Sequence, residues 1–151
     1  MDVKSGIMHE FGPVAGTFDL KATFPEWNGP SSGPKAKSLG WTVVRPGADG
    51  VVGLPTAEAG KVAVSYAFKS IESPGGQDVT LLLGCKGQAR VWVNGVMVHS
   101  TTPGRKDSDG PDTTTFNLRR GANPVFVKFA SDAANPGFTF TLLSDQELKG
   151  K

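Results

Sequence analysis

The chain has 151 residues, of which 38% are hydrophobic and 20% are charged, and its formal net charge is +2. This size and composition fit one soluble globular domain, and the scattered basic residues exclude the concentrated positive charge of a nucleic-acid-binding surface. The single cysteine excludes an internal disulfide and a clustered thiolate metal site, while 20 glycines and 11 prolines indicate turns rather than long helices.

The N-terminal part of the chain is predicted to hold an extension, a first strand, a long surface loop and a further pair of strands. Residues 1–10 lack the apolar region of a signal peptide and form an N-terminal extension, and the folded domain is expected to span residues 11–143. Residues 16–24 are predicted to form a strand, and residues 25–37 a long surface loop. Residues 41–44 and 51–54 are predicted to form a further pair of strands. No apolar run approaches the ~18 residues of a membrane span, so we expect no membrane partner.

Alternating hydrophobicity predicts antiparallel strands through the rest of the chain. Val79, Leu81 and Leu83 share one face of such a strand, and similar alternation is found at residues 62–69, 125–129 and 138–142. Turn clusters separate these stretches at roughly ten-residue spacing, and helical periodicity is almost absent. The pattern predicts an all-β fold, either an antiparallel two-sheet β-sandwich or a barrel, followed by a polar tail at residues 144–151.

The dipeptide Asn94-Gly95 predicts a β-hairpin with a two-residue type I′ turn. With that turn, residues that oppose each other share a face of the hairpin. One face then consists of four valines, and the other is mixed in polarity: Val91, Val93, Val96 and Val98 against Arg90, Trp92, Met97 and His99. We expect the valine face to join the core and the mixed face to be suited to a ligand or a partner.

Motifs for catalysis are missing from the sequence. His9 and His99 are its only histidines, and neither has metal-ligand spacing to another histidine or to Cys85. The Gly-x-Ser-x-Gly pattern at residues 29–33 falls in a predicted surface loop and not at a strand-to-helix turn, so we expect no nucleophile elbow, and the chain has no phosphate-binding glycine-rich turn. We therefore expect a protein that is not an enzyme and needs no cofactor, although carboxylates far apart in the chain could still converge in one cleft.

The loop at residues 105–112 is the densest polar stretch of the chain and offers candidate metal ligands. Asp107, Asp109 and Asp112 could supply hard oxygen atoms to a structural Ca²⁺. The loop lacks the full register of a calcium loop, and Arg105 and Lys106 would partly neutralise it. An ordinary solvated turn is the alternative, because aspartate, glycine and proline also favour turns.

Aromatic residues suggest a carbohydrate site, since sugar rings stack on flat side chains while polar neighbours bond the hydroxyls. Trp27 lies in a loop between Glu26 and Asn28, and Trp92 lies on the mixed face of the hairpin. The polar residues that could bond hydroxyls are expected to be Glu26, Asn28, Arg90, Arg105 and Asp109. In the alternative, Trp27 folds back to plug one end of the fold and another segment covers Trp92.

Three stretches carry a resemblance to a known family: Val91-Trp-Val-Asn-Gly-x-x-Val98, Phe116-Asn-Leu-Arg-Arg-Gly-Ala-Asn-Pro-Val-Phe-Val-Lys128 and Gly137-Phe-Thr-Phe-Thr-Leu142. They resemble the galactose-binding-domain-like β-sandwich over roughly residues 11–143. In that family the Asn-Gly turn ends a hairpin, and an element here formed by Leu118, Gly121 and Asn123 turns the chain into a core strand. The resemblance implies a jelly roll.

The same resemblance implies a function. Such domains occur in carbohydrate-binding modules and as accessory domains of large exported bacterial proteins, so we expect a non-catalytic module that binds a glycan weakly. Its partners would be a polysaccharide or glycan and neighbouring domains, in an extracellular or periplasmic setting. The alternative is a structural sandwich that binds no small molecule and buries the face of Trp92 and Met97 against a neighbouring domain or a second copy.

Overall fold

The computed structural model describes residues 44–56, 61–101, 110–134, 136–146 and 148–150, together with two short strands near the N-terminus. Every regular element in this described part is a β-strand, so it holds no helix that could cross a membrane. In chain order the strands are β1 (Phe24–Pro25), β2 (Ser38–Leu39), β3 (Val52–Gly53), β4 (Ala63–Ser73), β5 (Gln77–Cys85), β6 (Gln88–Val93), β7 (Val96–Ser100), β8 (Asp112–Leu118), β9 (Gly121–Ser131), β10 (Gly137–Leu143) and β11 (Lys149–Gly150).

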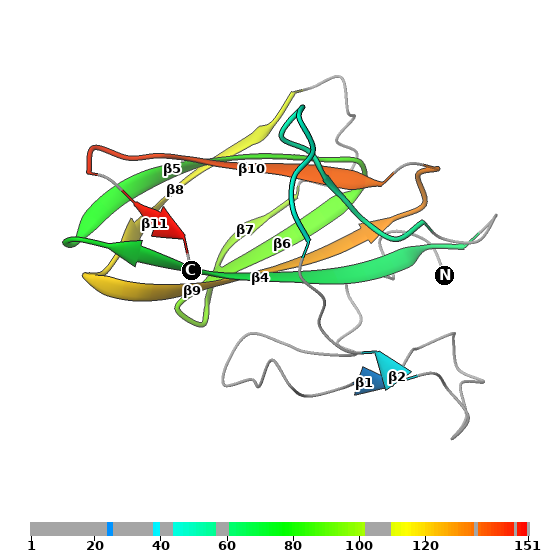
Figure 1. Cartoon of the computed structure of the whole chain (residues 1–151), viewed down its shortest axis with the longest axis horizontal. Coiled ribbons are helices and arrows are strands. Elements are labelled where there is room, and N and C mark those ends of the chain that lie inside the picture. The colour runs from blue at the N-terminus through cyan, green and yellow to red at the C-terminus, as the bar shows by residue number, and fades with distance from the viewer. Residues whose placement is uncertain are drawn as a thin grey trace.

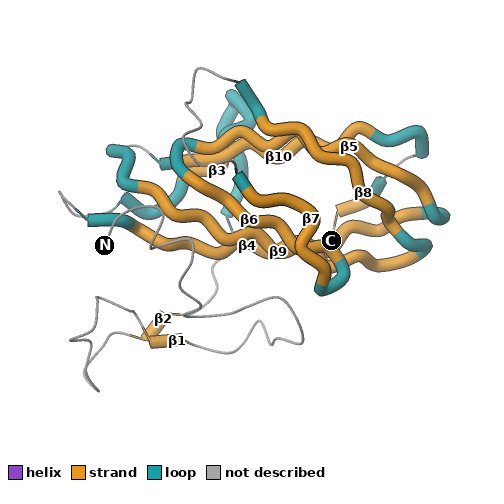
Figure 2. The backbone as a smooth tube through the Cα atoms, turned by 180° about the vertical axis from the view of Figure 1, so that it is seen from behind, coloured by secondary structure: helices purple, strands orange, loops and turns teal. Residues whose placement is uncertain are grey.

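Two antiparallel sheets lie face to face, as Figures 1 and 2 show from opposite sides. One has four strands in the order β3-β10-β5-β8, and the other has five in the order β11-β4-β9-β6-β7. A separate small sheet pairs β1 with β2. The predicted all-β, antiparallel two-sheet class is confirmed, and the arrangement is that of a β-sandwich rather than a barrel.

The strand pairs are nested along the chain. The hairpin β6–β7 is the innermost pair, and around it β5 pairs with β8, β4 with β9, and β3 with β10. Each step outward joins segments that are farther apart in sequence and alternates between the two sheets. The eight strands from β3 to β10 are therefore paired in a nested order that alternates between the two layers.

The core lies between the two sheets. It is built from alternate residues of β5, β6, β8 and β9, as the period of two requires. Phe129 of β9 and Phe138 of β10 stack across it with their ring centroids 4.4 Å apart. The predicted inward faces of β5, β6 and β9 are confirmed by the buried residues Val79, Leu81, Leu83, Val91, Val93, Val125, Val127 and Phe129.

The outer face of the five-stranded sheet is aromatic as well. Tyr66 and Phe68 of β4 lie on it, because their partners in the register are Lys128 and Phe126, which alternate with the core residues of β9. The Tyr66 and Phe126 rings are 5.9 Å apart, and Lys128 Nζ lies 5.9 Å from the Tyr66 centroid. Lys128 is only 3% exposed. The central strand β9 is thus buried on both faces.

Several predicted elements fall outside or at the border of the described residues. Residues 1–10, nearly all of the strand predicted at 16–24, and residues 41–43 with Trp41 lie outside them. Val44 is described but is not in a strand, whereas β3 occupies part of the strand predicted at 51–54. The segment expected to be a polar tail, 144–151, includes β11, which pairs with Glu72 and Ile71 of β4.

Candidate functional site

The hairpin β6–β7 has the turn that its sequence predicts. Asn94 and Gly95 have φ values of 52° and 82°, and a type I′ turn needs positive φ at both central positions. Val93 pairs with Val96, and Trp92 pairs with Met97, as expected. The turn is also fixed from outside, because the Asn94 backbone N–H donates to the Pro124 carbonyl at 3.0 Å.

Beyond these two pairs, the predicted register is wrong. The ladder shifts between Val91 and Trp92, so that Val91 pairs with His99 rather than with Val98, and Arg90 pairs with Ser100 rather than with His99. Val98 is the extra residue of a β-bulge, which bends the strand and redirects the side chains that follow. A bulge inserts one residue without any signature in hydrophobic alternation, and for this reason the sequence pattern missed it.

The bulge divides the expected valine face. Val91 and Val93 are in the core and Val98 packs partly against it, but Val96, at the tip of an edge strand, is 64% exposed. On the outer face of the hairpin Met97 is 50% exposed and Trp92 is half-buried. We call Trp92, Val96 and Met97 the hairpin surface. Its two exposed residues, Val96 and Met97, are neighbours at the tip of β7 and point to opposite faces of that strand, with Met97 on the same face as Trp92.

The bulge also brings His99 to the other sheet. His99 Nδ1 lies 2.8 Å from Thr114 Oγ1, and His99 Nε2 lies 3.0 Å from Asp112 Oδ2. Asp112 and Thr114 are two residues apart on β8 and so share one face of that strand. The His99 and Asp112 side chains are 12% and 20% exposed. These three residues, which we call the His99 clasp, join the edge strand β7 of one sheet to the edge strand β8 of the other.

The chemistry of the His99 clasp fits a structural link. With the proton on Nε2, the ring donates to the Asp112 carboxylate and accepts the Thr114 hydroxyl proton at Nδ1, so each polar group has a partner. The order hydroxyl, imidazole, carboxylate is also that of a nucleophile, a base and an orienting acid. However, a nucleophile elbow places its hydroxyl on a sharp strand-to-helix turn, whereas Thr114 lies inside β8, paired with Leu81.

The structure separates the residues that were expected to bind a ligand. Arg90 and Trp92 follow each other on one face of β6, and Arg90 is half-buried. Asp112 lies in the His99 clasp, away from that face. The other predicted ligand and metal residues lie outside the described part of the chain: Glu26, Trp27, Asn28, Arg105, Asp107 and Asp109.

The calcium hypothesis depends on residues that mostly lie outside the described part. A calcium ion bound by Asp112 would compete with His99 for the same carboxylate. Within the described ranges, no group of three histidine, cysteine, aspartate or glutamate side chains is placed to hold a metal ion. Calcium binding therefore stays a prediction that rests on Asp107 and Asp109.

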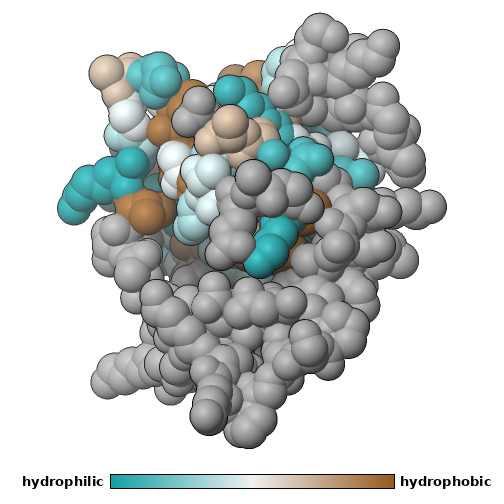
Figure 3. Space-filling view, turned by 90° about the vertical axis from the view of Figure 1, so that its right-hand side faces the viewer, coloured by the Kyte–Doolittle hydropathy of each residue, from teal (hydrophilic) through white to brown (hydrophobic). Residues whose placement is uncertain are grey.

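Sequence reasoning missed Thr114 and the exposure of Val96. The alternation of Asp112 and Thr114 places them on one face of a strand, which the sequence could have indicated, but their contact with His99 required the bulge. On the end of the molecule that Figure 3 faces, described hydrophobic residues form separate areas between hydrophilic ones rather than one continuous surface. Comparisons of the chain with protein-family models, curated proteins and solved structures found no match.

Proposed function

We propose that this chain is a non-catalytic module that docks through its hairpin surface onto an apolar surface of a neighbouring domain. The observation that carries the proposal is the exposure of Val96 (64%) and Met97 (50%) beside the half-buried Trp92. Exposed apolar side chains that are neighbours in sequence at the tip of a hairpin are candidates for protein contact sites. Methionine adapts to irregular partners, and tryptophan supplies a large contact area.

The partner contacts side chains rather than the strand edge. Strand β7 is an edge of the five-stranded sheet, and an edge can accept a further strand through its backbone groups. The bulge at Val98 interrupts the regular spacing of those groups on β7. Bulges protect edges in this way, so the proposed contact is made by the projecting side chains of the hairpin.

The proposal includes the finer class of the fold. A jelly roll is an antiparallel ribbon of eight strands wrapped into two sheets, and the nested pairing from β3–β10 inward to β6–β7 supports this assignment. The resemblance to galactose-binding-like domains suggests the setting: an accessory domain of a larger exported protein, outside the cell or in the periplasm.

A second candidate function is weak glycan binding, which one observation favours. Trp92 is half-buried on the outer face of β6 and shares that face with Arg90. Its ring could stack on a sugar while the guanidinium bonds a hydroxyl. Such sites bind with dissociation constants between micromolar and millimolar, which correspond to binding free energies of roughly −8 to −4 kcal/mol. The other residues expected to bond sugar hydroxyls, Glu26, Asn28, Arg105 and Asp109, lie outside the described part of the chain, so the docking function is favoured over this one.

Oxidation of Met97 by dilute peroxide tests the docking proposal. Mass spectrometry follows the Met97 sulfoxide in the isolated chain and in the chain within its native polypeptide. Docking onto a neighbouring domain predicts oxidation about tenfold slower in the native polypeptide and independent of concentration in the isolated chain. Equal rates in both settings would reject docking. Slower oxidation of the isolated chain at high concentration would instead identify a second copy as the partner.

The glycan function has its own test. Tryptophan fluorescence is titrated with a panel of soluble polysaccharides, first in the native sequence and then in Trp92→Ala. Glycan binding predicts a saturable change that Trp92→Ala abolishes and that Met97→Ala leaves in place. No response to any polysaccharide, or a response that survives Trp92→Ala, would reject glycan binding at the hairpin surface.

A further inference from the structure

Lys69 interrupts the inward face of strand β4. Its partner in the ladder is Val125, which belongs to the core, so the side chain of Lys69 starts on the inner side of the five-stranded sheet. Ala67 and Ile71, two residues away on either side, pack with the core. Yet Lys69 is exposed. It is a charged residue at a position where the alternation calls for an apolar one.

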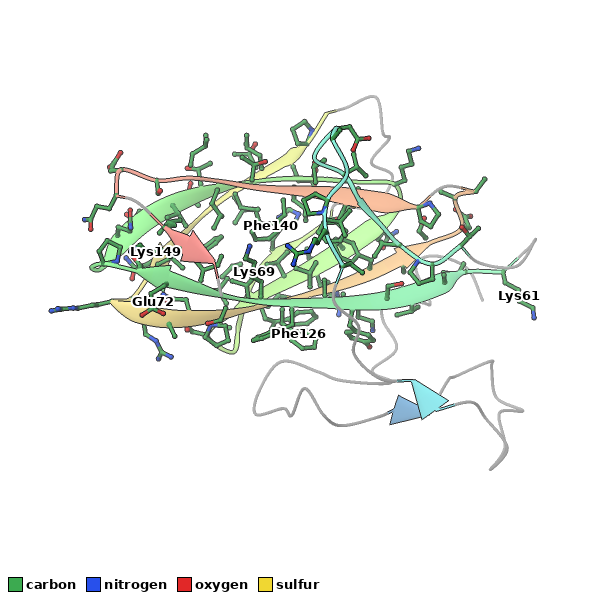
Figure 4. All side chains as sticks on the ribbon, in the orientation of Figure 1. Lys61, Lys69, Glu72, Phe126, Phe140 and Lys149 are labelled. Carbon is green, nitrogen blue, oxygen red and sulfur yellow. The ribbon has the colours of Figure 1, made fainter. Side chains whose placement is uncertain are left out.

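The side chain of Lys69 spans the margin between the two sheets. Figure 4 shows it pointing from β4 toward Phe140 of β10, in the opposite sheet. Phe140 and Leu142 are only partly buried where they pack against the core. A lysine can cover such apolar surface with its aliphatic stem while its ammonium group stays in water. In the described part of the chain no side chain pairs with that ammonium group.

Strand β4 lies near the edge of its sheet. Along one side, all eleven residues of β4 pair with β9. On the other side, β11 pairs with Ile71 and Glu72 and is the one described strand found there. A lysine that points inward on an edge strand is a known protection against added strands, because pairing would bury its charge.

We infer that Lys69 guards the β4 edge of the sandwich against a second copy of this chain. A strand added beside Lys69 would cover Phe140 and extend the core margin, which favours association. The same strand would take the Lys69 ammonium group out of water, which opposes it more strongly. A substitution that removes the Lys69 charge but keeps an apolar side chain leaves only the favourable burial of apolar surface. Two copies of the chain would then pair at this edge.

The test compares Lys69→Met with Lys149→Met in the full chain. Both variants remove one lysine charge near the same edge of the five-stranded sheet. Lys149 belongs to β11, however, and its partner in the ladder is Glu72, which is not a core residue. Sedimentation velocity over a hundredfold range of concentration measures self-association. We expect Lys69→Met to dimerise at least tenfold more tightly than the native chain and Lys149→Met to match the native chain. Lys69→Glu, which keeps a charge, is expected to stay monomeric.

Hydrogen exchange locates the contact. In dimeric Lys69→Met, amides of β4 should exchange more slowly than in the monomer, whereas slower exchange confined to β7 would indicate association through the hairpin surface. The proposed role of Lys69 is wrong if Lys69→Met sediments like the native chain or if Lys149→Met associates as strongly as Lys69→Met. It is also wrong if the amides of β4 are not protected in the dimer, or if the native chain already dimerises through β4. Lys69→Val repeats the test should Lys69→Met lose its cooperative unfolding transition.

Discussion

Asn94 and Asn123 are 29 positions apart in the chain, and a hydrogen bond of 2.8 Å from Asn94 Nδ2 to Asn123 Oδ1 joins them. Asn123 is completely buried. Its side chain also accepts the Arg119 backbone N–H and donates to the carbonyl groups of Ile71, Arg119 and Gly121. The entry to β9 is therefore tied to the hairpin turn and to β4 through one amide.

Asn123→Ala is predicted to destabilise the fold strongly. It removes the hydrogen-bond partner of one buried and three partly buried backbone groups, which costs about 2–4 kcal/mol in the free energy of unfolding. Chemical denaturation measures the loss. Asn117→Ala is the matched control, because Asn117 also bonds one side chain, that of Asp78, but is exposed. A loss for Asn123→Ala no larger than for Asn117→Ala would contradict the assigned role.

Gly87→Ala is predicted to be among the most damaging single changes. Gly87 has a φ of 131°, and an added Cβ would press on the Ala130 carbonyl oxygen and lie 3.0 Å from Ser131 Cβ. We expect a loss of at least about 3 kcal/mol, since backbone must move. Gly95→Ala is the control: its φ is also positive, but open space surrounds it, so about 1 kcal/mol is expected. Thermal or denaturant unfolding that ranks the two variants in the opposite order would refute this account of Gly87.

The His99 clasp should contribute measurable coupling energy. His99→Ala removes two hydrogen bonds across the sheets and is expected to cost about 1–3 kcal/mol, while Thr114→Val removes one of them and costs about 1 kcal/mol. A double-mutant cycle measures their coupling, expected at about 0.5–1 kcal/mol. Thr113→Val, the exposed neighbour on β8, serves as the control. Additive effects of His99→Ala and Thr114→Val on the free energy of unfolding would show that the His99–Thr114 hydrogen bond does not contribute to stability.

Substitutions in the hairpin surface are predicted to spare stability. Val96→Thr and Met97→Thr change exposed side chains, so the free energy of unfolding should stay within about 0.5 kcal/mol of the native value. Val93→Thr buries a hydroxyl in the core and should cost about 1–3 kcal/mol. Urea unfolding separates the two classes. Large losses at Val96 or Met97 would mean that these residues support the fold rather than a contact.

Local chemistry made part of the fold predictable. The Asn94-Gly95 turn, the inward faces of β5 and β9 and the separation into turn-linked antiparallel strands follow from glycine, asparagine and the alternation of side chains. The nested pairing did not follow, because it joins distant segments. In β4 the alternation also hid the inward face: Tyr66 and Phe68 look like core residues, but the smaller Ala67 faces the interior.

The candidate site was less predictable than the fold. Trp92 opposite Met97 follows from the turn alone. The position of His99 depends on the bulge at Val98, and the partner of His99 comes from the other sheet. Contacts of this kind are decided by how two layers meet, and a single sequence carries no pattern for them.

The nested ribbon has a consequence for how the chain finds its shape. We expect the tight turn at its centre to close first because it joins neighbours in sequence, so that each later pair has only a short remaining gap to bridge. The strand pairs can then form in order from the innermost to the outermost, although β3 and β10 are far apart along the chain. Destabilising substitutions in the hairpin β6–β7 would therefore slow folding, whereas destabilising substitutions in the outermost strands would mainly increase the rate of unfolding.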